Sequence, residues 1–76
     1  MGNPESAAHV AAELRAARAR RRMTQVEVAK RANLAPNTVR RLEAGERDVS
    51  LGQILALAEA LDISPHVFLV EPERQQ

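Results

Sequence analysis

The chain has 76 residues, no cysteine and a formal net charge of +1 at pH 7. This length corresponds to one small domain, and without cysteine a hydrophobic core must hold it together, because disulfides and thiolate metal sites are excluded. No apolar run approaches about 18 residues, which excludes a membrane-spanning helix, and the N-terminus lacks the pattern of a secretory signal peptide. We therefore expect a soluble protein of the cytoplasm.

The small net charge hides a strong asymmetry along the chain. Residues 15–41 contain nine lysines or arginines and one acid, so this segment carries a charge of +8, and the remaining residues carry −7. A basic half beside an acidic half suits a protein that presents one face to a polyanion. A charged surface that is merely solvated would give the same pattern, so charge alone does not decide the function.

Apolar residues recur at helical spacing and no segment alternates with period two, so we predict an all-α fold with five helices. The first helix is expected to begin near Asn3 or Ser6 and to end in the arginine run 20–22. Its inward stripe comprises Val10, Leu14 and Ala17. We divide the chain into an N-terminal arm or helix start at 1–9, a domain at 10–70 and a tail at 71–76.

The second and third helices have clear start and stop signals. Thr24-x-x-Glu27 is a capping box that predicts the start of the second helix, and Asn33 suits the left-handed turn after it. The apolar positions of the second helix are Val26, Val28, Ala29 and Ala32. Pro36 is typical of a first helical position, although Ala35 before it is a poor cap, and Gly45 predicts the end of the third helix.

Another capping box, Ser50-x-x-Gln53, predicts a fourth helix. Its expected apolar face consists of Leu51, Ile54, Leu55, Ala58 and Leu61. Ser64 and Pro65 are predicted to begin a short fifth helix. This last helix would contain Val67, Phe68, Leu69 and Val70.

Two short helices that cross at a tight turn form the layout of a helix-turn-helix, whose second helix fits the major groove of DNA. On a helical wheel of about 100° per residue, Val39, Leu42 and Glu43 lie on the inner side of the third helix. The outer side carries Asn37, Arg40, Arg41 and Ala44. Because arginine can bind guanine bidentately and asparagine can bind adenine, this outer side has the chemistry to distinguish bases.

Four motifs connect these elements to a known family. They are Leu14-Arg-x-x-Arg18, Met23-Thr-Gln25-x-Glu-Val-Ala29, Leu34-Ala-Pro-Asn-Thr-Val-Arg-Arg-Leu-Glu43-x-Gly45 and Leu55-x-x-x-x-Ala60-Leu-Asp-Ile-Ser64. In combination the motifs resemble the phage-repressor/Cro type of helix-turn-helix domain, the XRE-like family, over roughly residues 10–69. The resemblance implies a compact five-helix domain, of bacterial or phage origin, that binds double-stranded DNA through the third helix.

The resemblance also implies roles for individual residues. The expected base contacts are Pro36, Asn37, Arg40 and Arg41. Gln25 matches a glutamine that binds a phosphate and braces the third helix, aided by the N–H groups of its helix end. Further phosphate contacts are predicted for Arg22, Thr24, Thr38 and Arg47. Arg18 and Glu43 match a pair that forms a structural ion pair between the first and third helices.

Three positions depart from the usual residues of the family. Arg22 stands where glycine is usual, so the turn after the first helix is expected to be strained or shifted. Asn33 replaces a frequent glycine, which asparagine tolerates in the left-handed region. Pro36 occupies a position that often holds a polar base-reading side chain, so any base contact there must be apolar, for example to a thymine methyl group.

We expect a sequence-specific transcriptional regulator, in particular a repressor, that associates with the nucleoid when bound. The apolar fifth helix indicates a homodimer, although Phe68 could simply fill the core. One alternative is an antitoxin that binds a toxin partner and regulates its own operon. Another is a co-regulator that no longer binds DNA, against which the arginines of the third helix argue.

No enzyme, cofactor or metal is expected. The sequence offers no nucleophile with a matching base and no glycine-rich phosphate loop. His9 and His66 are isolated histidines, and a metal site needs more ligands than either supplies.

Overall fold

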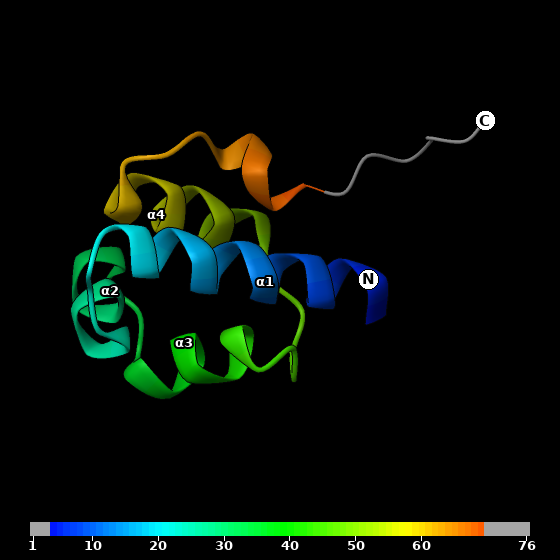
Figure 1. Ribbon diagram of the computed structural model, residues 1–76. Helices are drawn as coiled ribbons and strands as arrows, with labels where there is room; N and C mark the ends of the chain where they lie inside the picture. The colour runs from blue at the N-terminus through cyan, green and yellow to red at the C-terminus, as the bar shows by residue number, and fades with distance from the viewer. Residues whose placement is uncertain (1–3, 70–76) are drawn as a thin grey trace.

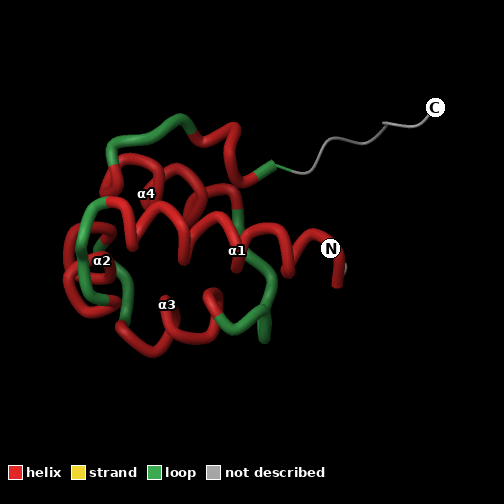
Figure 2. The backbone as a smooth tube through the Cα atoms, viewed as in Figure 1, coloured by secondary structure: helices red, strands yellow, loops and turns green. Residues whose placement is uncertain are grey.

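The structure is a computed structural model that describes residues 4–69. Its elements are α1 (Pro4–Arg20), α2 (Gln25–Ala32), α3 (Pro36–Glu43), α4 (Leu51–Leu61) and the 3₁₀ helix η1 (Pro65–Phe68). Within these residues the fold is all-α, and none of its helices is long and apolar enough to cross a membrane. In the view of Figure 1, α1 crosses in front, with α4 above it, α3 below it and α2 at one end. Short loops join the helices (Figure 2).

The prediction of five α-helices is wrong, because the described residues form four and the fifth segment is a 3₁₀ turn. In this segment backbone N–H groups donate to the carbonyl three residues earlier, as Val67 N–H does to Ser64 at 3.2 Å and Leu69 N–H does to His66 at 3.0 Å. Pro65 lacks an N–H, and four residues are too few to continue as an α-helix. Asn3, Val70 and the predicted tail at 71–76 lie outside the described residues.

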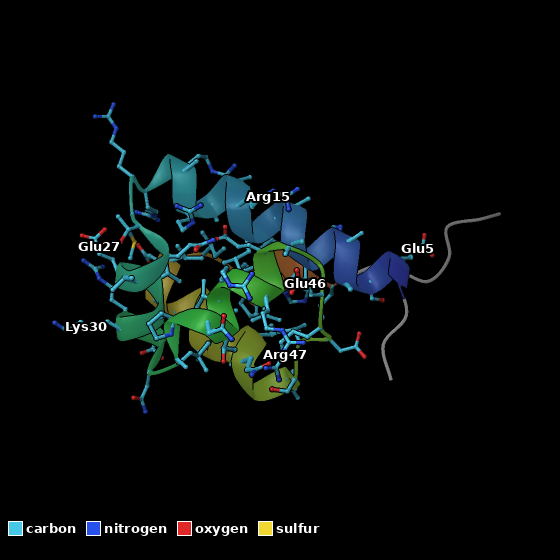
Figure 3. The ribbon with its side chains drawn as sticks, turned by 90° about the horizontal axis from the view of Figure 1, so that it is seen from below. Glu5, Arg15, Glu27, Lys30, Glu46 and Arg47 are labelled. Atoms are coloured by element: carbon cyan, nitrogen blue, oxygen red, sulfur yellow. The ribbon has the colours of Figure 1, made fainter. Side chains whose placement is uncertain are left out.

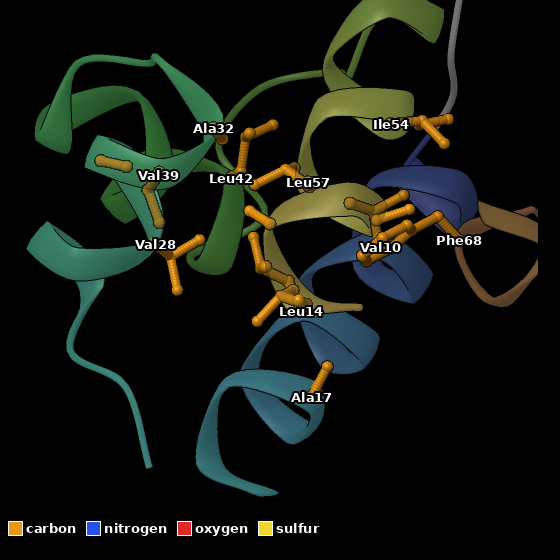
Figure 4. Close-up of a cluster of buried hydrophobic side chains, with 14 residues drawn as sticks. Val10, Leu14, Ala17, Val28, Ala32, Val39, Leu42, Ile54, Leu57 and Phe68 are labelled. Atoms are coloured by element: carbon orange, nitrogen blue, oxygen red, sulfur yellow. The ribbon is translucent and has the colours of Figure 1, made fainter. Parts of the chain in front are cut away.

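All five elements contribute to one hydrophobic core (Figure 4). The predicted stripe of α1 is confirmed, since Val10, Leu14 and Ala17 are buried. Where α2 and α3 pack together, Ala29 and Val39 are fully buried, so the two helices approach closely. Phe68, the only aromatic residue of the chain, is 2% exposed and fills the core beside α1 and α4.

The expected apolar face of α4 is partly wrong. Leu51 is 68% exposed and Leu55 is 52% exposed, whereas Leu57 is fully buried. The side of α4 that packs inward consists of Ile54, Leu57, Ala58, Ala60 and Leu61. Because α4 is apolar almost all round, helical periodicity does not single out its buried side. Val26 of α2 is likewise exposed rather than buried.

The predicted starts of α2, α3 and α4 are confirmed. Thr24 and Ser50 both form complete capping boxes, in which side chain and backbone exchange hydrogen bonds with the residue three positions on. Ala35, predicted to be a poor cap, makes no side-chain capping bond before α3. The entry into α3 therefore depends on Pro36, whose fixed φ suits the first helical position.

Each α-helix of the described chain ends in the same kind of turn, with one residue in the left-handed region. These residues are Arg22 (φ 56°), Asn33 (58°), Gly45 (71°) and Asp62 (57°). After α1, Arg22 N–H donates to the Ala19 carbonyl at 3.0 Å and Met23 N–H donates to the Arg18 carbonyl at 3.1 Å. This pair of bonds is the Schellman motif, which satisfies the last carbonyls of a helix. Arg22 thus adopts a conformation that favours glycine.

Candidate nucleic-acid interface

The outward side of α3 carries the residues predicted to contact bases. Pro36, Asn37 and Arg40 are exposed, and Arg41 is partly exposed. Val39 and Leu42, on the opposite side, are buried in the core. Figure 3 looks onto α3 from below, with Arg15, Lys30 and Arg47 around it. The fold therefore leaves the polar side of α3 open to solvent.

Two contacts organise the side chains on this surface. Arg40 Nε donates a hydrogen bond to Asn37 Oδ1 at 2.9 Å. Arg41 Nε instead lies 3.7 Å from Glu46 Oε1, in an ion pair with both side chains about half exposed. The two neighbouring arginines therefore point to different partners, one on α3 and one in the loop that follows it.

Glu43 is the buried charge beneath this surface, with a side chain that is 4% exposed. Its carboxylate accepts hydrogen bonds from Arg18 Nε at 2.5 Å and from Arg18 Nη2 at 3.0 Å. Gln25 Nε2 donates to the same carboxylate at 3.0 Å. The structure thus brings together α1, the start of α2 and the end of α3 at one side chain. The hydrogen bonds to Glu43 raise the pKa of Arg18 above its already high ordinary value.

Arg15 is a contact residue that the sequence analysis missed. Its Nη1 donates to the backbone carbonyl of Glu43 at 2.6 Å, so a cation caps the C-terminal end of α3. Arg18 Nη1 also donates to the Met23 carbonyl at 2.9 Å, in the turn after α1. The sequence did contain a clue to this contact, because Arg15 and Arg18 are three residues apart and so lie on the same side of α1.

The residues predicted to bind phosphates come from α2, α3 and the loops that precede α2 and follow α3. Gln25 is half-buried at the start of α2, and Thr24 caps that helix by accepting from Glu27 N–H at 3.0 Å. Arg22 is exposed in the turn before α2, and Thr38 is half-buried on α3. Arg47 is exposed in the loop after α3 (Figure 3). These residues come from four segments, and only Gln25 is tied to another predicted site residue, by its bond to Glu43.

Comparison with known proteins identifies this arrangement. Residues 14–68 match the family model described as helix-turn-helix. The chain belongs to the helix-turn-helix family. It is a DNA-binding transcriptional regulator of the XRE type, in which α2 and α3 form the helix-turn-helix motif.

A solved structure extends the likeness beyond the motif. This helix-turn-helix protein is similar to the restriction-modification controller protein C.AhdI from Aeromonas hydrophila, with 35% sequence identity and a TM-score of 0.79. The match covers 83% of this chain and 96% of that chain. Among curated proteins, no similar sequence is found.

Proposed function

We propose that this protein is a sequence-specific repressor that places α3 in the major groove of DNA. The observation that carries the proposal is the exposed side of α3, where Asn37, Arg40 and Arg41 lie outward from the core. Guanidinium groups donate to guanine and amides bind adenine or guanine, so this helix carries base-reading chemistry. Pro36, exposed at the start of the helix, offers an apolar contact to a thymine methyl group.

Phosphate contacts would fix the position of α3 in the groove. Gln25 is suited to this role because Glu43 holds one N–H of its amide, which leaves the second N–H as a donor. The unpaired N–H groups at the start of α2 favour the same phosphate. The remaining proposed contacts are the exposed residues Arg22, Thr24 and Arg47 and the half-buried Thr38 of α3.

We also propose a homodimer that binds an inverted repeat, with half-sites about 34–36 Å apart. Phe68 is buried, so the dimer contact would use the apolar side chains that remain exposed. Leu51 and Leu55 lie one turn apart on α4, and Leu69, after η1, is 47% exposed. Covering these side chains would remove apolar surface from water, which favours association.

The similarity to C.AhdI supports a second, narrower candidate. Because the likeness extends over 96% of a restriction-modification controller protein, this chain could serve as a controller of restriction-modification genes. This candidate shares the DNA-binding surface of the repressor and differs in the genes that it regulates. The neighbouring genes would separate it from the antitoxin alternative, which requires a toxin gene beside this one.

The decisive experiment is a binding titration on the DNA upstream of the protein's own gene, with scrambled DNA in parallel and several salt concentrations. The Arg41→Ala variant should lose about 1–3 kcal/mol on the upstream DNA and much less on the scrambled DNA. Arg31→Ala, which removes an exposed arginine from α2, serves as the matched control and should affect both DNAs alike. Equal and weak binding of the wild type to both DNAs refutes the proposal and directs attention to a protein partner such as a toxin.

A further inference from the structure

Two exposed side chains of α3 are joined before any DNA is present. Arg40 Nε donates to Asn37 Oδ1 at 2.9 Å. Because Nε of arginine is only a donor, the amide atom that faces it is the oxygen, and the Nδ2 group of Asn37 points away from the guanidinium. Arg41, the next residue along, pairs with Glu46 instead, so the cation beside Asn37 is that of Arg40.

This pairing changes what Asn37 can recognise. An asparagine that binds adenine uses both ends of its amide, since the oxygen accepts from the N6 amino group and Nδ2 donates to N7. Here one lone pair of the oxygen is occupied by Arg40. A base amino group that approached the other lone pair would bring its hydrogens close to a guanidinium cation, which is electrostatically unfavourable.

Because the guanidinium disfavours a base amino group at the second lone pair of Asn37 Oδ1, the groups left for base contacts on this pair are donors. Asn37 keeps the two hydrogens of Nδ2, and Arg40 keeps the hydrogens of Nη1 and Nη2. In the major groove guanine presents two acceptors, O6 and N7, whereas adenine presents an acceptor beside an amino donor. A surface that only donates therefore matches guanine.

We propose that Arg40 sets the base preference of Asn37, so that the two side chains act as one donor-only unit that selects guanine. Without Arg40, Asn37 would be an independent amide that can bind adenine through both ends. The inference rests on the proposed function, because it requires α3 to lie in the major groove. The inference goes beyond the proposed function because it assigns guanine as the base that Asn37 contacts. It also makes Arg40 the residue that determines this preference.

The test measures binding to the upstream DNA site and to a set of variant sites, in each of which one base pair of that DNA is replaced. The Asn37→Ala variant first identifies the base pair that Asn37 contacts, as the position where base discrimination is lost. At that position the wild type should prefer guanine. In Arg40→Ala, the affinity for adenine relative to guanine should rise about tenfold at the same position.

Arg31→Ala is the matched control, because it removes an exposed arginine from α2 and leaves the contact between Arg40 and Asn37 intact. It should leave the ratio of adenine to guanine binding at the Asn37 position unchanged. The three substituted residues are all exposed, Asn37 and Arg40 on α3 and Arg31 on α2, and thermal melting would verify that each variant is folded.

The failures of the inference and of the proposed function are distinguishable. If the wild type binds upstream and scrambled DNA equally, the proposed function fails and the inference fails with it. If the wild type discriminates but Arg40→Ala only weakens binding, with an unchanged ratio at the Asn37 position, the inference alone is overturned. A wild-type preference for adenine at that position, or no effect of Asn37→Ala at any position, also overturns it.

Discussion

Replacing Glu43 with glutamine changes one oxygen of a buried carboxylate to an NH₂ group and keeps the shape of the side chain. In the wild type the carboxylate accepts three side-chain hydrogen bonds, two from Arg18 and one from Gln25. A Glu43→Gln side chain keeps one accepting oxygen, so its NH₂ group must face an N–H of Arg18 or of Gln25. At least one of the three bonds becomes a contact between two donors.

The magnitude follows from these contacts. A hydrogen bond to a charged group contributes about 1.5–3 kcal/mol, and we take about 2 kcal/mol because the Arg18 side chain is 25% exposed and partly screened. A 76-residue domain has about 4–11 kcal/mol of total stability, so this loss is a large fraction of it. At about 4–8 °C per kcal/mol, the melting temperature should fall by about 8–16 °C.

Thermal unfolding followed by circular dichroism measures this change. Glu59→Gln removes the same charge from an exposed position of α4 and should change the melting temperature little. If Glu43→Gln melts within about 2 °C of the wild type, the bonds around Glu43 do not stabilise the fold and the reasoning is refuted.

Three further outcomes are expected. Arg22→Gly should stabilise the domain by about 0.5–1 kcal/mol, because relieving the left-handed backbone strain outweighs the added entropy of the unfolded chain. Chemical denaturation measures this change, and a lower denaturation midpoint would contradict it. Gln25→Ala should weaken binding to upstream and scrambled DNA alike. The salt dependence of the affinity should stay unchanged, since Gln25 carries no charge, and a shallower salt slope would argue against a neutral phosphate contact. Leu55→Glu should shift the protein to a monomer in sedimentation while its melting temperature is kept, and a persistent dimer would exclude this surface of α4.

The sequence predicted the features that depend on near neighbours in the chain. The capping boxes at Thr24 and Ser50 and the left-handed conformations of Asn33 and Gly45 are confirmed, because each depends on residues only a few positions away. Burial of the α1 stripe was also predictable, since Val10, Leu14 and Ala17 recur at intervals of four and three residues, which places them on one side of a helix.

Features that depend on how helices cross were not predictable in the same way. The buried side of α4 could not be found by periodicity, because leucines such as Leu55 and Leu57 occur on both its sides. The pair formed by Arg18 and Glu43 was expected from family resemblance alone, since 25 residues separate its members. The contact of Arg15 with the end of α3 was missed for the same reason, and the roles of the predicted DNA contacts remain predictions.

The attachment of α3 to α1 has a consequence for binding kinetics. Arg15 Nη1 donates to the last carbonyl of α3 and Arg18 binds its buried carboxylate, so the proposed recognition helix α3 is held in place by the fold itself. The conformational entropy of α3 is therefore lost when the protein folds and not when it binds DNA, so ordering α3 does not reduce the affinity for DNA. An interface that needs no rearrangement associates at a rate set mainly by diffusion and charge, so different operator sequences should differ chiefly in how long the complex lasts.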